Sequence, residues 1–195
     1  FKSNIRQIAK IAKTAGITQK RAELLFRITN YFQPISILEI GTSLGLATSA
    51  LALGSRSVGT KAKITTLEGC PETANQCQLQ LQKFNINTVK SIVTEFSTYF
   101  KTINHKPEAI NLIYFDGNHS KKATLDYFEC LLPTITNDCV WIFDDIHWST
   151  EMEEAWENIK KHPKVKVTID TFQWGFVFFR KEQEKERFGR AAPVP

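Results

Sequence analysis

The sequence lacks several features that mark common protein classes. Its four cysteines, Cys70, Cys77, Cys130 and Cys139, form no CxxC pair and show no Cys/His zinc-ligand spacing, which indicates neither a zinc site nor a small disulfide framework. No run of 18 or more apolar residues is present, and the start "FKSNIRQIAKIAKTAG" is basic and amphipathic without the apolar core of a secretion signal. We therefore expect a soluble, non-secreted protein without a membrane segment, in the reducing cytoplasm.

The chain is short, and its charge is unevenly spread. With 195 residues, 42% of them hydrophobic, it can form one well-packed domain but no second one of ordinary size. The net charge is +5, yet residues 1–27 hold seven Lys or Arg against Glu23 alone, a pattern that nucleic-acid binding could explain. Ile5, Ile8 and Ile11 stand at three-residue spacing, however, which is typical of a helix that docks one face and solvates the other. We favour the docked helix over a nucleic-acid partner.

Helical and strand patterns alternate along most of the chain. The patterns predict helices at 3–14, 19–32, 46–53, 71–83, 120–132 and 150–161, and strands at 35–40, 63–68, 88–93, 110–115, 139–143, 164–170 and 174–179. Pro71 suits a first helical turn, Ser120 suits an N-cap, and Thr150 with Glu153 fits a capping box. This alternation is typical of a mostly parallel sheet with helices on both faces.

Only "TFQ" joins the last two predicted strands, which is too short for a parallel crossover and so predicts an antiparallel hairpin. We predict an α/β, Rossmann-like fold with seven mostly parallel strands and a terminal antiparallel hairpin. Residues 1–33 are expected to form a helical segment packed on the core, residues 34–181 the main domain, and residues 182–195 a charged, solvated tail or an added expression sequence.

Two strand ends carry the residues of a nucleoside site. The first strand runs into Glu39-Ile40-Gly41-Thr42-Ser43-Leu44-Gly45, where glycines allow a tight turn and a close approach to a ligand. The second strand ends in Glu68, a carboxylate placed to accept the hydroxyls of a ribose. Ligands of such folds bind at the carboxyl ends of the strands, so we favour a nucleoside site over purely structural turns.

Three further acids follow the fourth and fifth strands. Asp116 directly follows the strand "INLIYF", and Asp144 and Asp145 directly follow the strand "CVWIF". These acids could be solvated caps of the helices that follow. A hard divalent cation such as Mg²⁺ takes oxygen ligands and would relieve the repulsion among three carboxylates. We expect such a cation here.

The stretch "ILEIGTSLGLATSALA" resembles the S-adenosylmethionine loop of class I methyltransferases, whereas the GxGxxG of dinucleotide folds is broken by Ser43 and Leu46. The resemblance covers residues 20–180 and is strongest to small O-methyltransferases of the catechol and antibiotic-sugar kind. It implies that the methionine end of S-adenosylmethionine lies near Glu39 and Gly41 and that Glu68 holds the ribose. The cofactor-binding residues that it implies are Glu39, Gly41, Thr42, Ser43, Gly45, Glu68, Gly69, Cys70, Ser97 and Asp116, with the adenine near Gly69, Cys70 and the loop "VTEFS".

The resemblance also implies roles for the acids and for a histidine. Metal ligands in these enzymes follow strands four and five, which here gives Asp116, Asp144 and Asp145, and His119 stands where catechol enzymes carry a lysine base. His119 could instead cap the helix at Ser120, and His147 is a second candidate base. Trp148 could line one side of the acceptor site. The other large aromatic residues singled out are expected in the core, namely Trp141, Phe143, Trp156, Trp174 and Phe176.

The function expected is transfer of a methyl group from S-adenosylmethionine to a hydroxyl of a small molecule, assisted by Mg²⁺ or another divalent cation, with Asp116 and His119 as catalytic residues. Alternatives are an RNA methyltransferase and a non-catalytic nucleoside-binding protein of the same fold. Against the first, "DGNH" follows strand four where base N-methylating enzymes place a polar residue, Pro-Pro and an aromatic. A homo-oligomer remains open.

Overall fold

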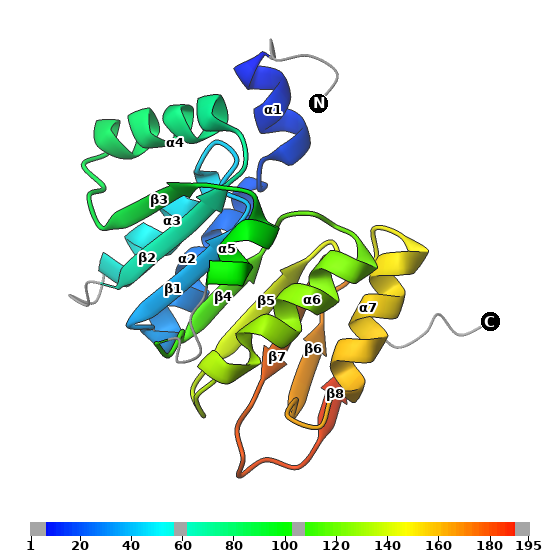
Figure 1. The fold of residues 1–195 in the computed structure, drawn as a ribbon. Helices are drawn as coiled ribbons and strands as arrows, with labels where there is room; N and C mark the ends of the chain where they lie inside the picture. The colour runs from blue at the N-terminus through cyan, green and yellow to red at the C-terminus, as the bar shows by residue number, and fades with distance from the viewer. Residues whose placement is uncertain (1–6, 57–61, 103–107, 190–195) are drawn as a thin grey trace. The chain divides into compact units, whose positions relative to one another are not determined.

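The structure is a computed structural model that describes residues 7–56, 62–102 and 108–189 (Figure 1). By its internal contacts the chain forms two compact units. Unit 1 comprises Phe1–Ile35 and Gly41–Phe96, and unit 2 comprises Ser36–Ile40 and Ser97–Pro195. The predicted boundaries at residues 33/34 and 181/182 stay predictions.

The described residues of unit 1 form four helices and two strands. They are α1 (Ile8–Ala15), α2 (Gln19–Phe32), α3 (Leu46–Arg56), β2 (Lys63–Glu68), α4 (Pro71–Lys83) and β3 (Val89–Val93). β2 and β3 pair in parallel, with Glu68 opposite Val93 at their carboxyl ends. The predicted bounds of α2 and α4 agree with the structure, and Pro71 occupies the first turn of α4 as expected.

The closest helix packing in unit 1 joins α2 to α3. A side chain at Gly54 of α3 would place its Cβ 2.6 Å from the carbonyl oxygen of Phe26 and 2.8 Å from Cβ of Thr29, so only glycine lets the two helices approach this closely. Thr29 is buried and donates its hydroxyl to the carbonyl of Leu25 at 2.9 Å, which satisfies its polar group within the helix.

The expected docking of the first helix stays a prediction. Residues 3–6 lie outside the described part of the chain, α1 begins at Ile8, and none of its residues is buried. Ile8 itself is 50% exposed. The apolar stripe of α1 consists of two isoleucines and small alanines, which offers little area to bury.

In unit 2, the part of the chain that the structure describes forms three α-helices, one 3₁₀ helix and six strands. They are β1 (Ser36–Ile40), α5 (Phe96–Thr102, starting on the last residue of unit 1), β4 (Leu112–Phe115), α6 (Lys121–Leu131), η1 (Leu132–Thr134), β5 (Val140–Asp144), α7 (Thr150–Lys161), β6 (Val167–Asp170), β7 (Trp174–Phe178) and β8 (Glu186–Phe188). β1, β4 and β5 are parallel neighbours, whereas β7 runs antiparallel to both β5 and β6. The predicted terminal hairpin is therefore confirmed.

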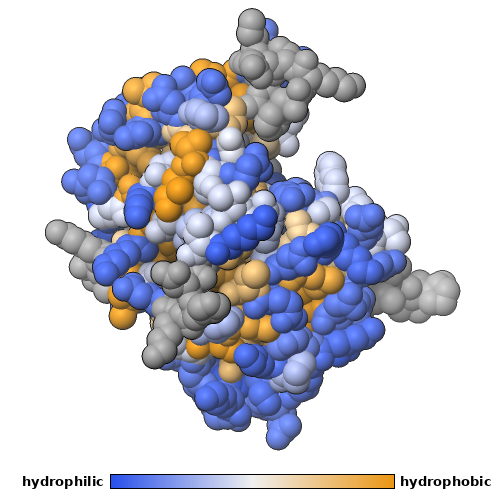
Figure 2. Space-filling model, viewed as in Figure 1, coloured by the Kyte–Doolittle hydropathy of each residue, from blue (hydrophilic) through white to orange (hydrophobic). Residues whose placement is uncertain are grey.

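The central strands β4 and β5 of unit 2 are apolar because helices cover them. Every residue of β4 and β5 is buried, as expected for strands that meet side chains on both faces. Phe115 and Phe143 stack in this core with ring centroids 4.1 Å apart, and all five aromatic residues expected in the core are buried. α6 and α7 lie side by side (Figure 1), and the surface over α7 is mostly hydrophilic in Figure 2.

Two helix caps bear on the sequence predictions. Ser120 caps α6 as expected, because its hydroxyl accepts from the amide of Ala123 at 3.4 Å. The predicted cap at Thr150 is wrong by one residue: Ser149 is the N-cap, its hydroxyl accepts from the amide of Met152 at 3.3 Å, and Thr150 is the first helical residue. Both hydroxyl residues suit a cap, and backbone geometry chooses between them.

The fold class is the predicted one, an α/β Rossmann-like fold with mostly parallel strands and a terminal antiparallel hairpin. The described residues contain eight strands instead of seven, because residues 186–188 of the expected tail pair in parallel with β6. Lys185 secures this strand by donating to the carbonyls of Lys161 and His162 at 3.2 and 2.9 Å. Within the described residues, no helix has the length and apolar character needed to cross a membrane.

Candidate active site

The loop that follows β1 in the sequence adopts a glycine-dependent conformation in unit 1. Gly41 and Gly45 have φ angles of 102° and 80°, a region that L-residues rarely occupy. At Gly45 a Cβ would also lie 2.4 Å from Sγ of Cys77, so both space and backbone require glycine there. The amides of Gly41 and Thr42 donate to the carbonyl of Leu67 at 3.1 and 3.0 Å. These bonds attach the loop to the end of β2.

Glu68 organises this loop with both oxygens of its carboxylate. Oε2 accepts from the amide of Ser43 and Oε1 from the amide of Cys70, each at 2.9 Å. The bond to Ser43 helps to hold that residue at φ 48°. A carboxylate has about four acceptor positions, so two are used by the backbone and the others are available to a ligand. This anchoring role was not predicted from the sequence.

The residues expected around an adenine lie in both units. Gly69 is exposed, and Cys70 is the residue before α4, with its Sγ donating to Glu72 at 3.3 Å. A Cβ at Gly69 would meet no atom closer than 3.9 Å, so glycine is not sterically required there. Ser97 is an exposed residue in the first turn of α5 in unit 2. Their roles remain predictions.

Four acidic side chains gather in unit 2, and we call Glu39, Asp116, Asp144 and Asp145 the acid cluster. They come from the carboxyl ends of three parallel neighbours, β1, β4 and β5. Glu39 is fully buried and Asp144 is 5% exposed. Asp144 accepts from the hydroxyl of Tyr114 at 3.0 Å and from the amide of Asp145 at 2.9 Å, which fixes its orientation.

The cluster strongly perturbs Asp116. Burial raises the pKa of Asp116 well above its usual range, and Asp144, Glu39 and Asp145 raise it further, Asp144 also through a hydrogen bond. The carboxyl group of Asp116 therefore retains its proton to a higher pH than an ordinary aspartate. Among the described residues no group of three or more His, Cys, Asp or Glu side chains has the geometry to hold a metal ion.

His119 lies beside these acids. Its Nε2 is 3.7 Å from Oδ1 of Asp116 and 3.9 Å from Oδ2 of Asp145, and 27% of its side chain is exposed. Because Ser120 caps α6, His119 is not needed for that purpose. The structure thus brings together His119 and the three predicted metal ligands.

His147, the second candidate base, is occupied on both sides of its ring. Nδ1 lies 3.1 Å from Oε1 of Glu153, and Nε2 lies 2.9 Å from Oδ2 of Asp170. Burial lowers the pKa of His147, but the hydrogen bonds to Asp170 and Glu153 outweigh it and the net pKa is raised. Both ring nitrogens of His147 therefore face carboxylates, and its role as a base stays a prediction.

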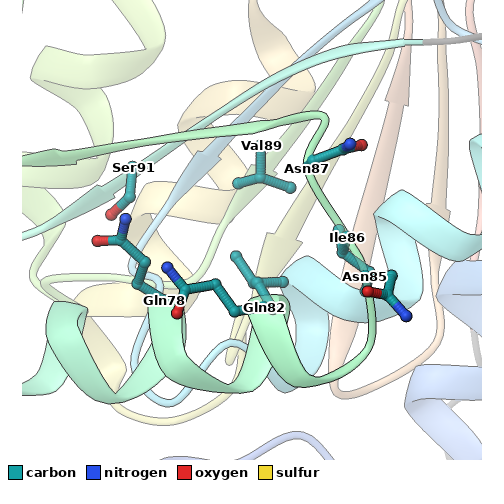
Figure 3. Close-up of a pocket in the computed structure, with 8 residues that line it drawn as sticks. Gln78, Gln82, Asn85, Ile86, Asn87, Val89 and Ser91 are labelled. Atoms are coloured by element: carbon teal, nitrogen blue, oxygen red, sulfur yellow. The ribbon is translucent and has the colours of Figure 1, made fainter.

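A separate groove of about 480 Å³ lies in unit 1 between α4 and β3 (Figure 3). Gln78 and Gln82 of α4 point toward the strand, where Val89 and Ser91 line the other wall. The lining holds no carboxylate or histidine and none of the predicted site residues. We assign it no part in the chemistry.

Comparison with known protein families identifies the family of this chain. A family model described as "Methyltransferase domain" matches residues 38–146, more than half of the chain, from β1 to just after β5. The chain belongs to this methyltransferase family. The sequence-based prediction of a methyltransferase is therefore confirmed.

The methyltransferase also resembles many solved structures. Among them is an S-adenosylhomocysteine-bound methyltransferase, PaMTH1 of Podospora anserina, at TM-score 0.73 and 18% identity over 85% of this chain and 80% of that one. A putative O-methyltransferase from Klebsiella pneumoniae matches at TM-score 0.72 and 18% identity, covering 92% and 93%. The O-methyltransferase TomG of Streptomyces achromogenes, involved in tomaymycin synthesis and solved with S-adenosylmethionine, matches at TM-score 0.71 and 16% identity, covering 91% of each chain. No curated protein matches this methyltransferase in sequence.

Proposed function

We propose that this chain is an S-adenosylmethionine-dependent O-methyltransferase that methylates a hydroxyl of a small molecule with the help of a divalent cation, preferably Mg²⁺. The observation that carries the proposal is the acid cluster with His119 beside it: Nε2 of His119 lies within 4 Å of both Asp116 and Asp145. This arrangement suits deprotonation of a hydroxyl, because a positioned histidine can act as the base and a cation held by the acids would lower the pKa of the hydroxyl.

The methyl donor is assigned to the Gly41–Gly45 loop and Glu68. Glu68 has acceptor positions left after binding two backbone amides, and a ribose offers two adjacent hydroxyl donors. Gly41, Thr42, Ser43 and Gly45 supply close backbone contact. Methyltransferases of similar fold are solved with S-adenosylmethionine or its demethylated product, which supports this assignment.

The acid cluster suits a hard cation by its chemistry. Asp116, Asp144 and Asp145 offer only oxygen donors, the ligands that Mg²⁺ prefers. Burial raises the pKa of Asp116, and repulsion from the neighbouring acids raises it further. A bound cation would relieve this repulsion by replacing the retained proton, at the cost of a rearrangement of the three side chains. When bound, it would lower the pKa of an acceptor hydroxyl in contact with it.

His119 is assigned the role of general base. Nε2 takes the proton of the acceptor hydroxyl, and the oxygen then forms a bond to the methyl carbon as that carbon leaves the sulfonium sulfur. The products are a methyl ether and S-adenosylhomocysteine. Asp116 and Asp145 flank the ring and stabilise the imidazolium that the proton transfer creates.

The test measures transfer of labelled methyl from S-adenosylmethionine to catechol and sugar acceptors, with Mg²⁺ and with a strong chelator. We expect Asp144→Asn to abolish cation-dependent turnover and His119→Ala to slow it about 10²- to 10⁴-fold, while binding of S-adenosylhomocysteine is retained. Asp126→Asn is the matched control, because Asp126 is an exposed acid of α6 paired only locally with Lys122. Turnover that survives both the chelator and Asp144→Asn refutes the cation, and failure to bind S-adenosylhomocysteine refutes the function.

One observation keeps a second candidate, an RNA methyltransferase, in view. α1 carries Lys10 and Lys13 and has no buried residue, so a basic helix is open to an anionic partner. The same assay with an RNA acceptor separates the two. A non-catalytic nucleoside-binding role predicts cofactor binding without transfer to any acceptor. We further propose a cytoplasmic location, and a homo-oligomer stays open.

A further inference from the structure

The turn between β6 and β7 holds an unusually placed aromatic residue. Phe172 has φ 75°, a left-handed conformation that glycine or asparagine adopts readily and that strains a phenylalanine. More than half of its side chain, 51%, is exposed. The strain and the exposure of an apolar ring both reduce stability, and strained residues of this kind often mark ligand contacts.

The surrounding residues hold Phe172 firmly in this position. Its amide donates to Oδ1 of Asp170 at 2.8 Å, and Thr171 closes the turn with bonds to both the amide and the carbonyl of Trp174. The ring stacks on the imidazole of His147, with centroids 5.3 Å apart and planes within 17°. Asp170 binds His147 as well. A single carboxylate therefore fixes both members of the stacked pair.

The pair lies at the same edge of the sheet as the acid cluster. β6 and β5 both run antiparallel to β7, and Asp144 at the end of β5 stands opposite Trp174, just after the turn. His147 follows Asp145 within one tight turn, closed by the bond from the amide of Trp148 to the carbonyl of Asp145 at 2.9 Å. Trp148 is 73% exposed. Aromatic surface thus accumulates beside the proposed hydroxyl-binding acids.

We propose that Phe172, backed by His147, is a specificity-determining residue that forms an aromatic wall of the acceptor site and selects acceptors whose hydroxyl is carried on a planar ring. This inference rests on the proposed function. Ring-on-ring packing rewards a flat acceptor, and the stacked imidazole of His147 keeps the phenyl ring of Phe172 in place behind it. A puckered sugar gains much less from such a wall.

The experiment compares two acceptors of different shape, 3,4-dihydroxybenzoate and methyl glucoside, in wild type and in Phe172→Asn. We expect wild type to prefer the planar acceptor. Asparagine accepts the left-handed backbone, so the variant should fold with a Tm within about 3 °C of wild type, because relief of strain offsets the lost stacking. KM for the planar acceptor should rise about three- to tenfold with kcat little changed. A separate variant, Phe172→Tyr, should keep the wild-type KM for the planar acceptor.

The matched control is Phe188→Ala, since Phe188 of β8 is equally exposed at 53% and should leave both acceptors unaffected. A wild-type preference for the sugar, an unchanged KM in Phe172→Asn, or equal losses for both acceptors would overturn the aromatic wall while leaving O-methylation intact. Wild-type protein that binds S-adenosylhomocysteine but methylates neither probe also overturns it. Loss of S-adenosylhomocysteine binding in the wild type instead refutes the proposed function.

Discussion

Replacing Glu68 with glutamine tests whether one side chain both shapes the donor loop and binds the donor. In the wild type its two oxygens accept from the amides of Ser43 and Cys70, each at 2.9 Å. Glutamine keeps one acceptor oxygen, and its NH₂ group faces the other amide donor to donor. One backbone bond is therefore lost, and the negative charge that strengthens the other disappears.

The expected loss of stability follows from these two bonds. A hydrogen bond to a charged acceptor contributes about 1.5 to 3 kcal/mol, and the half-buried position of Glu68 reduces this because water can replace part of the lost bond. We expect Glu68→Gln to lower the free energy of unfolding by about 1 to 2 kcal/mol, which shifts Tm down by about 2 to 8 °C for a chain of this size. Urea or thermal denaturation measures this directly.

The affinity for S-adenosylhomocysteine should fall as well. If the remaining acceptor positions of Glu68 bind ribose hydroxyls, loss of charge and of one acceptor weakens binding by roughly 10- to 100-fold, as measured by titration calorimetry. Glu23→Gln, at an exposed acid of α2 in the same unit, is the control and should change neither quantity. Unchanged affinity in Glu68→Gln refutes the ribose assignment, and unchanged stability refutes the anchoring role.

Two further predictions concern stability. Asp170→Ala should cost about 3 kcal/mol, because it leaves the indole N–H of Trp156, bonded at 3.1 Å, without its partner and breaks the ion pair with His147. Burial raises the pKa of Asp170, but hydrogen bonds from the amide of Phe172 and from the side chains of His147 and Trp156 outweigh this effect, and the net pKa is lowered. The stability that ionised Asp170 contributes is therefore lost as pH falls through that lowered pKa. The pKa of His147 is raised, so the stability contributed by the Asp170–His147 ion pair is lost as pH rises through that pKa. Urea denaturation should therefore show the largest difference in stability between wild type and Asp170→Ala at about pH 4 to 6.5. A difference independent of pH would contradict the ion pair. Gly45→Ala should cost about 2 kcal/mol or more, since the φ of 80° and the 2.4 Å approach to Cys77 admit no Cβ; a variant with wild-type Tm would show that the loop adapts freely.

Most of the fold was predictable because its signals are local and strong. The buried strands are continuous apolar runs, and α2, α4 and α7 carry clear periodicity, so their bounds agree with the structure. β8 was missed because all three of its residues are exposed, and its pairing depends on β6 and on Lys185, neither of which leaves a pattern in the strand itself. The docking of α1 stays a prediction, because an amphipathic stripe predicts a face to bury but cannot reveal whether a partner surface exists.

The site was predictable only in part. The positions of Asp116, Asp144 and Asp145 after strand ends were enough to predict that they lie together, since parallel neighbours present their carboxyl ends at one edge of the sheet. The contact that holds His147 comes from Asp170, which lies 23 residues away along the chain. The strain at Phe172 is a backbone angle that the residue types of "TFQWG" do not predict. Glu68 was singled out for a ligand, yet its bonds to two backbone amides arise from loop geometry that residue type does not encode.

The position of β7 between β5 and β6 has a consequence for synthesis of the protein. β5 is complete at Asp144, but the strand that covers its second edge ends only at Phe178, 34 residues later. At roughly 5 to 20 residues per second, a nascent chain leaves this largely apolar strand edge open for about 2 to 7 s after β5 is made. Exposed strand edges recruit other chains. Ribosomes that stall within this window should therefore yield aggregation-prone fragments that need chaperone protection, whereas release after residue 178 closes the edge.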